Sequence, residues 1–355
     1  MAPRKVETGG RDLISSLPDE LLSEILYLLP TQTAASTSIL SKRWKNLLPL
    51  VHNLDFDKST MVFASLISRT LVLLGDSPIH KFSLEWKSEK AQHLIYPLIY
   101  NALQREVLEL HLISPKRQFV PSELFFSKTL VKLTLTLGCF ARRNDNLVLD
   151  QQVWGSSIKR ITTFYRSCGL DDYSCFIFKT PSLVFLDYSS YVAQDYLVQF
   201  DDSLVEARLD IRLWKYYDHV LPLPISYGYQ LSKHGERGWQ VLPLLLRKSP
   251  NLETLIINGL VHKITNLCGD VCVCDHGKMM RSCCLLSCRV KVLKVYGYEG
   301  SCGELNQMRH FLKNLRFLKL VKVKVQEQVN YLSLTNDLTK LLSTASSSNC
   351  KIQFI

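Results

Sequence analysis

A short apolar pattern, L-x-x-L-x-L with other apolar residues allowed at the L positions, recurs through most of this 355-residue chain. Nine copies begin at residues 79, 107, 130, 158, 183, 204, 252, 290 and 315. Their central positions are 28, 23, 28, 25, 21, 48, 38 and 25 residues apart. The spacing of 48 equals two steps of 24 and predicts one more degenerate copy between residues 212 and 250. A period of about 20–29 residues predicts a stack of small units, because one unit cannot bury its apolar face alone.

That period is typical of leucine-rich repeats, in which each copy supplies one short strand. Alternate side chains of a strand point to opposite faces, so the apolar residues would face a core and the residues between them a continuous concave surface. The outward register also includes Ser83 and Thr134. The candidates that we select on this surface for binding a partner are Lys81, Glu109, His111, Lys132, Asp187, Glu206, Arg208, Lys294, Tyr296, Phe317 and Lys319.

The N-terminal segment has a different, helical pattern. Leu17, Leu21, Ile25 and Leu28 recur at steps of four, four and three residues, which places them on one helical face. Pro18 suits the first helical position, and Pro30 ends the helix. Two further short helices are predicted over 31–40 and from about Ser41, with Trp44 in the second. We therefore divide the chain into a disordered tail (1–11), a three-helix unit (12–57) and a repeat region (58–355).

Three short helices are too few to build a robust core alone. An apolar helix on so small a unit is typical of recognition in which a helix binds a groove of a partner. The alternative is that the helix caps the first repeat, because the ends of a repeat array must be covered.

The segment "DLISSLPDELLSEILYLLPTQTAASTSILSKRWKNLLP" (12–49) resembles an F-box. Its matching features are the Leu17-Pro18 pair, the helical stripe, the Leu29-Pro30 pair and "LSKRW" at 40–44. With the repeats that follow, the chain is similar to the plant F-box/LRR-repeat proteins. The C-terminal part, from about 285 to 355, resembles the FBD-type end of many members. The predicted fold class is α/β: a small three-helix F-box followed by an irregular leucine-rich-repeat solenoid.

The resemblance implies the substrate-recognition subunit of an SCF (Skp–cullin–F-box) ubiquitin ligase. The box would bind the Skp-family adaptor, and through it the cullin and RING subunits, while the repeats hold an unknown protein substrate. Such a subunit is not an enzyme and acts by proximity. The alternative is a repeat scaffold that no longer binds the adaptor. The residues carried over as adaptor-binding or box-core positions are Leu17, Pro18, Leu21, Ile25, Leu28, Pro30, Leu40 and Trp44.

The composition limits the remaining possibilities. We find no secretory signal and no apolar run as long as a membrane span, so the expected compartment is the cytosol or nucleus, with the 11 cysteines mostly free. The stretch from Cys268 to Cys288 holds six cysteines and His276, but its spacing does not form a clean zinc site, so no metal is assigned. No cofactor motif or catalytic motif is present.

Basic residues gather late in the chain. Between Lys278 and Lys324 there are eleven Lys and Arg against Glu299 and Glu304, and the whole chain carries +11. This charge is compatible with a solvated face, with an acidic partner or with nucleic acid. No known nucleic-acid-binding motif accompanies it, so we do not predict a nucleic-acid-binding protein.

Overall fold

The computed structural model describes most of the chain. The described residues are 14, 16–56, 67–72, 74–86, 92–118, 121–140, 150–165, 175–191, 195–200, 202–212, 239, 241–260, 271–273, 284–325, 331–342 and 349–355. The predicted tail (1–11) lies outside these residues, as does most of the segment between 212 and 250.

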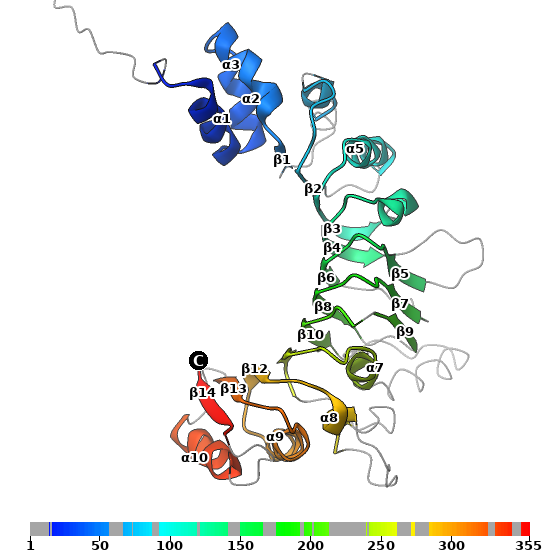
Figure 1. The fold of residues 1–355 in the computed structure, drawn as a ribbon, viewed down its shortest axis with the longest axis vertical. Helices are drawn as coiled ribbons and strands as arrows, with labels where there is room; N and C mark the ends of the chain where they lie inside the picture. Colours follow the sequence, from blue (N-terminus) through cyan, green and yellow to red (C-terminus); the bar gives the residue numbers. More distant parts are fainter. Residues whose placement is uncertain are drawn as a thin grey trace, which may run out of the picture.

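The N-terminal unit is built from three short helices, as the sequence predicts (Figure 1). Helix α1 (Asp19–Leu28) follows Pro18, and Asp19 and Glu20 lie in its first turn, where the helix dipole favours negative charge. Pro30 then separates α1 from α2. The unit is completed by α2 (Thr31–Thr37), α3 (Lys42–Leu47) and the 3-10 turn η1 (Leu48–Leu50).

The rest of the chain is organised around an eleven-stranded sheet in which every pairing is parallel. Its strands follow one another in chain order without crossovers between distant copies. They are β1 (Asn53–Phe56), β2 (Lys81–Glu85), β3 (Glu109–Gln118), β4 (Lys132–Phe140), β6 (Arg160–Tyr165), β8 (Phe185–Tyr191), β10 (Glu206–Arg212), β11 (Thr254–Asn258), β12 (Val292–Tyr298), β13 (Leu320–Val325) and β14 (Lys351–Phe354).

The connecting segments lie on the other side of this sheet. They include the helices α5 (Gln92–Gln104), α7 (Val241–Lys248), α8 (Cys284–Ser287), α9 (Cys302–Asn314) and α10 (Tyr331–Leu341), and the 3-10 turn η3 (Ser122–Phe126). Three extended segments, β5 (Asp150–Trp154), β7 (Cys175–Lys179) and β9 (Asp195–Gln199), form a second parallel sheet there. The sequence did not predict this second sheet. None of the helices in the described ranges is both long and apolar enough to cross a membrane.

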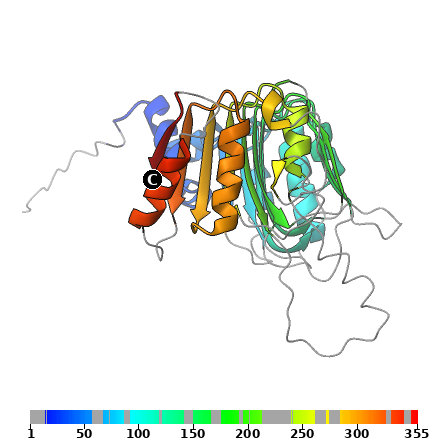
Figure 2. The same cartoon turned by 90° about the horizontal axis from the view of Figure 1, so that it is seen from below.

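The molecule is a crescent whose inner side is lined by the large sheet (Figure 1). Figure 2 shows the same sheet from below, with its strands side by side and the helices along one face. Neighbouring strands lie about 4.8 Å apart, whereas packed helices need about 8–10 Å. Because the helical side takes more room per copy, the stack bends toward its strands.

The apolar periodicity correctly predicts which side chains are buried. In the copy at residues 130–135 the three leucines are buried and Lys132 and Thr134 are half-buried on the opposite side. The weakest copy also fits, because Ile158 and Ile161 are buried. The buried apolar residues form one contiguous cluster that runs from α1 to α10. The structure is thus a mixed α/β protein with an N-terminal helical unit and a large parallel sheet sharing one core.

Three details of the repeat prediction are wrong. The predicted copy between 212 and 250 adds no strand to the large sheet, because β10 pairs directly with β11. The sheet also starts earlier, since "VHNLDF" (51–56) is a copy that we placed in the helical unit, and its Leu54 is paired with Phe82. In the last predicted copy the strand lies three residues later, because Leu293 pairs with Val321 and not with Leu318.

Candidate functional site

Helix α1 is apolar on two faces, and only one of them is buried. Leu22 and Leu26 are completely buried. Leu21, Ile25 and Leu28 lie on the other face with 50%, 38% and 79% of their surface exposed. Full burial of such a side chain contributes about 1.5–3 kcal/mol relative to full exposure, so each of these three partly exposed side chains forgoes part of that amount. We define Leu21, Ile25 and Leu28 as the exposed stripe.

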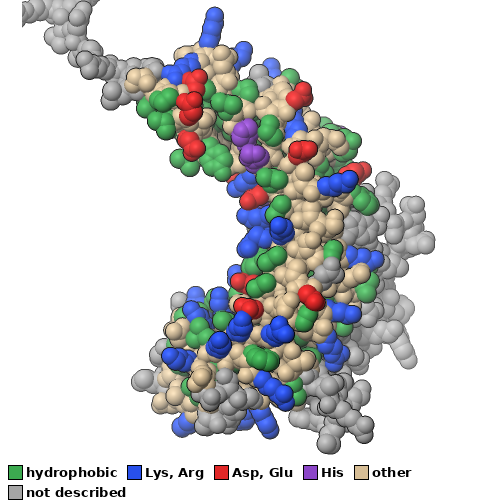
Figure 3. All heavy atoms as spheres, viewed as in Figure 1, with side chains coloured by type: hydrophobic (Ala, Val, Ile, Leu, Met, Phe, Trp, Pro, Cys, Tyr) green, Lys and Arg blue, Asp and Glu red, His purple; other side chains and the backbone are tan. Residues whose placement is uncertain are grey.

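A second group of exposed apolar residues follows α2. Ile39 and Leu40 are 86% and 70% exposed in the turn that leads to α3. Leu40 was selected from the sequence, whereas Ile39 was not, although it is the neighbouring residue in an otherwise Ser- and Thr-rich segment. Figure 3 shows hydrophobic side chains on the surface of this helical unit.

Of the remaining residues selected from the F-box resemblance, two are half-buried and two are exposed. Leu17 and Trp44 are half-buried and pack against the core, which indicates a supporting role in the box. Pro18 and Pro30 are exposed at the starts of α1 and α2. The structure thus separates half-buried from exposed positions in this set, and the assignment of each to adaptor binding stays a prediction.

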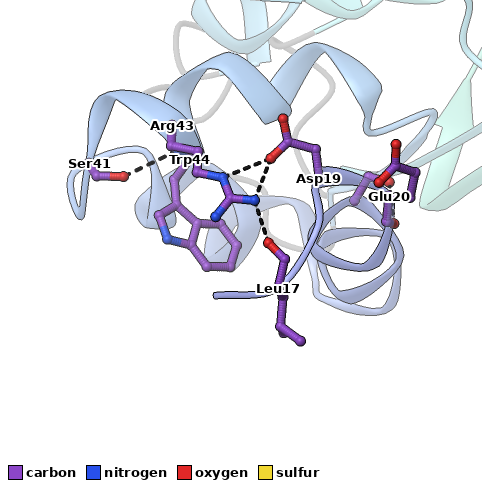
Figure 4. A network of polar contacts seen from close by, with 7 residues as sticks. Leu17, Asp19, Glu20, Ser41, Arg43 and Trp44 are labelled. Carbon is purple, nitrogen blue, oxygen red and sulfur yellow. Dashed lines mark hydrogen bonds and ion pairs between the residues drawn. The ribbon is translucent and has the colours of Figure 1, made fainter. Parts of the chain in front are cut away.

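A polar network holds α3 against the start of α1 (Figure 4). Arg43 donates from Nε to Oδ1 of Asp19 at 2.7 Å, and its terminal nitrogen donates to the backbone carbonyl of Leu17. The hydroxyl of Ser41 accepts a hydrogen bond from the backbone N–H of Trp44 at 3.4 Å, which caps the start of α3. Sequence reasoning quoted Arg43 within "LSKRW" but gave it no role.

The inner face of the large sheet carries most of the predicted partner-binding residues in continuous rows. In the first row Lys81, Glu109 and Lys132 are register partners, and the row continues through Arg160 and Phe185 to Glu206. In the second row His111, Asp187, Arg208 and Lys294 lie on one line across the strands, together with Ser83, Thr134, Thr162 and Ile256. Tyr296 belongs to a third row, between Asn258 and Lys324.

Two of the predicted residues lie outside these rows. Phe317 is exposed in the turn before β13, and Lys319 precedes the strand, where its N–H bonds to the carbonyl of Lys291. The reason is the three-residue offset of the last copy. The positions that the sequence prediction gave to Phe317 and Lys319 are occupied by Leu320 and Lys322, the register partners of Val292 and Lys294.

Charges along the middle of the inner face are largely paired. Lys132 contacts Glu109 at 3.1 Å, and Arg208 lies 3.9 Å from Asp187. The guanidinium of Arg160 stacks 4.1 Å from the ring centre of Phe185. Burial raises the pKa of Asp187 despite Arg208, with Asp210 and Glu206 adding to the rise. Burial also lowers the pKa of His111, where Lys81 and Lys132 oppose Asp55 and Glu85.

The cysteine-rich stretch is described only in part. Cys272, Cys284 and Cys288 are buried, and the Cys288 thiol donates to the carbonyl of Leu285 at 3.3 Å. Cys268, Cys274, His276 and Cys283 lie outside the described residues. Within the described ranges no three His, Cys, Asp or Glu side chains are grouped to hold a metal ion.

Fold and surface together define a protein of two parts: a helical unit with an exposed apolar stripe, and a curved sheet with a polar inner face. Comparison with known proteins agrees with both parts. The F-box domain family matches residues 14–54. The chain is 37% identical over 458 residues to F-box protein At4g27050 of Arabidopsis thaliana, covering 97% of this chain and 99% of that protein.

Two relatives carry the repeats in their names. F-box/LRR-repeat protein At1g48400 of Arabidopsis thaliana is 33% identical over 484 residues, covering 99% of both chains. F-box/LRR-repeat protein At5g35995 of the same plant is 34% identical over 458 residues, covering 98% of this chain and all of that protein. The chain therefore belongs to the F-box/LRR-repeat protein family, which confirms the resemblance noted from the sequence.

Proposed function

We propose that this protein is the substrate-recognition subunit of an SCF ubiquitin ligase. In this proposal the F-box binds a Skp-family adaptor through the exposed stripe on α1, with Ile39 and Leu40 beside α3 as further candidates. The cullin and RING subunits join through that adaptor. The parallel sheet and its outer segments act as an irregular leucine-rich-repeat solenoid, whose inner face holds the protein to be ubiquitinated in the cytoplasm or nucleus.

The observation that carries the proposal is the division of α1 into two apolar faces. Leu22 and Leu26 already join the core, so the cap alternative accounts for one face of the helix. It does not account for Leu21, Ile25 and Leu28, which remain exposed after the repeats are covered. An apolar stripe at this spacing is the pattern by which a helix binds a hydrophobic groove.

The protein's own contribution to ubiquitin transfer is positional. It holds the substrate and the loaded conjugating enzyme in one assembly and so replaces a collision by an intramolecular encounter. In this proposal no bond is made or broken by its side chains. The FBD-like assignment of the C-terminal part remains a prediction; that part contributes α9, α10 and the last strands of the sheet.

The decisive experiment is co-purification of the full chain with a Skp-family adaptor. The triple variant L21A/I25A/L28A should still fold, because none of the three side chains belongs to the buried core, and should bind the adaptor about a hundredfold more weakly. F126A is the matched control, since Phe126 is an equally exposed apolar residue of η3, far along the chain.

Stoichiometric binding that is lost only in the triple variant supports the ligase proposal. A folded wild-type chain that binds no adaptor would favour the repeat scaffold. Equal affinity of the wild type and the triple variant would show that the adaptor binds elsewhere.

A further inference from the structure

The inner face becomes basic on its last three strands, β12, β13 and β14. On β12 and β13, Lys294 and Lys322 are register partners, and Lys324 follows two residues later beside Tyr296. On the last strand Lys351 is paired with Leu320. We define these four lysines as the basic strip. Figure 3 shows Lys and Arg side chains along the inner rim and over the C-terminal arm of the crescent.

The basic strip contains no neutralising carboxylate. The outward positions of β12, β13 and β14 are Val292, Lys294, Tyr296, Leu320, Lys322, Lys324, Lys351 and Gln353. Among the residues that the structure describes, none of the four lysines forms an ion pair, in contrast to Lys132 with Glu109 and Arg208 with Asp187 on the earlier strands. Like charges on directly opposed positions destabilise a sheet. Adjacent lysines without a counter-charge therefore repel one another in the free protein, and an acidic partner would relieve this repulsion.

The dimensions of the strip limit what it can bind. Register partners on neighbouring strands lie about 4.8 Å apart, and residues two apart on one strand lie about 6.6 Å apart. Asp187, Glu206 and Asp210 lie on β8 and β10, separated from the strip by β11, and the sheet ends at β14. A long polyanion laid across the strands would extend beyond the strip to these carboxylates, whereas a short acidic segment would contact the strip alone.

Apolar side chains lie beside the lysines. Val292 and Leu320 are register partners in the first row, and Ile256 is the neighbour of Lys294 in the second. The ring of Tyr296 lies 5.8 Å from the Arg208 guanidinium. An incoming segment can therefore place one apolar side chain on Val292 and Leu320 while its carboxylates meet Lys294 and Lys322.

From this arrangement we propose that the basic strip binds an acidic segment of the substrate protein. The segment is rich in Asp and Glu, extended, and flanked by an apolar residue. The proposal rests on the proposed function, because it names the class of substrate that the inner face selects. Charge complementarity of this kind contributes specificity and association rate more than raw affinity, and it weakens as salt rises.

The test uses the full chain co-purified with the Skp-family adaptor and three labelled probes. The first is a peptide containing Leu followed by Glu-Ser-Glu-Ser-Glu, the second replaces each Glu by Gln, and the third is a single-stranded DNA of about the same length. Binding of each probe is followed by fluorescence anisotropy at low and at physiological salt. We expect the Glu peptide to bind, the Gln peptide to bind at least tenfold more weakly, and DNA to bind no better than the Gln peptide.

Two double variants distinguish the effect of the basic strip from the effect of the protein's net charge. K294E/K322E should weaken the Glu peptide about a hundredfold, because attraction is replaced by repulsion. K128E/K248E changes the net charge equally, at two exposed lysines after η3 and in α7 on the outer side, and should leave binding within twofold. If K294E/K322E fails to fold, K294Q/K322Q, which only removes charge, should lose about tenfold.

Each other outcome overturns the proposal. Equal binding of the Glu and Gln peptides, or unchanged binding by K294E/K322E, would show that the strip does not select acidic segments. DNA binding tighter than that of the Glu peptide, lost in K294E/K322E, would assign the strip to nucleic acid instead. The adaptor in the same preparation distinguishes the two proposals: a complex that retains the adaptor but ignores the Glu peptide refutes only the acidic-segment proposal.

Discussion

Arg43 on α3 and Asp19 at the start of α1 form a charged hydrogen bond of 2.7 Å across the helical unit. The same guanidinium also reaches the carbonyl of Leu17. One side chain thereby fixes the loop that enters α1 and sets the angle at which the helix presents Leu21 and Leu28. The two side chains are 37% and 56% exposed, so solvent screens much of their attraction.

We predict that Arg43→Ala loosens the box without unfolding the chain. The expected loss of local stability is about 1 kcal/mol, because a screened pair and one backbone hydrogen bond are removed. Hydrogen exchange of the α1 amides should become faster, and adaptor affinity should fall less than in L21A/I25A/L28A. Exchange in α9 serves as the internal control; unchanged exchange in α1 would show that the network is not needed there.

The two faces of α1 should respond differently to truncation. Leu26→Ala creates a cavity in the shared core and should destabilise the protein by about 2–5 kcal/mol. Leu28→Ala removes exposed atoms and should change stability by less than about 0.5 kcal/mol. Urea unfolding followed by circular dichroism measures both. Similar losses in the two variants would contradict the assignment of the faces.

The helical unit is joined to the sheet by a partly buried hydrogen bond. The backbone N–H of Asp55 on β1 donates to Oγ1 of Thr31 on α2 at 2.6 Å, and Thr31 is buried. Thr31→Val keeps the shape but leaves this N–H without a partner, so we expect a loss of about 1–3 kcal/mol. Thr37→Val is the matched control, because its hydroxyl only bonds back to the α2 carbonyl of Ala34. A Thr31→Val loss no larger than that of the control would mean that the junction does not depend on this bond.

The sequence predicted the buried positions of the sheet well because their cause is local. A strand that buries one face must alternate, so Leu133 and Leu135 could be placed in the core without knowledge of their neighbours. The prediction of strand position failed where two overlapping segments both fitted the repeat pattern. "LRFLKL" (315–320) and the overlapping "LKLVKV" (318–323) both fit it, and only the burial of Val321 and Val323 decides between them.

The existence of the exposed stripe could be predicted from the sequence, but its exposure could not, for a similar reason. Periodicity placed Leu21, Ile25 and Leu28 on one face, but Leu22, Leu26 and Leu29 form a second stripe one residue later. Which stripe faces the core depends on where α3 and η1 pack against α1, and that is tertiary information. The second sheet was missed because its strands contact one another across copies, as when Phe176 on β7 packs against Tyr196 on β9.

The lowered pKa of His111 predicts how the stability of the folded protein changes in acid. Burial, with Lys81 and Lys132, lowers the pKa of His111 in the folded protein below the value of 6.5 that it has in an unfolded chain. As the pH falls through 6.5, the unfolded state takes up a proton that the folded state resists, so the folded protein loses stability until the folded pKa is passed. Above 6.5 both states are neutral at this residue and the contribution is constant.

His111→Gln should therefore gain stability relative to the wild type when the pH is lowered from about 7.5 to 5.5, whatever its difference at the higher pH. Urea unfolding of both proteins at the two pH values measures the change. Thr134→Ser, at the register partner of His111 on β4, introduces no titrating group and should keep a constant difference from the wild type. A His111→Gln difference that is independent of pH would mean that folding leaves the proton affinity of the histidine unchanged. A difference that turns against the variant in acid would mean that the histidine gains proton affinity on folding, so that the carboxylates of Asp55 and Glu85 outweigh its burial.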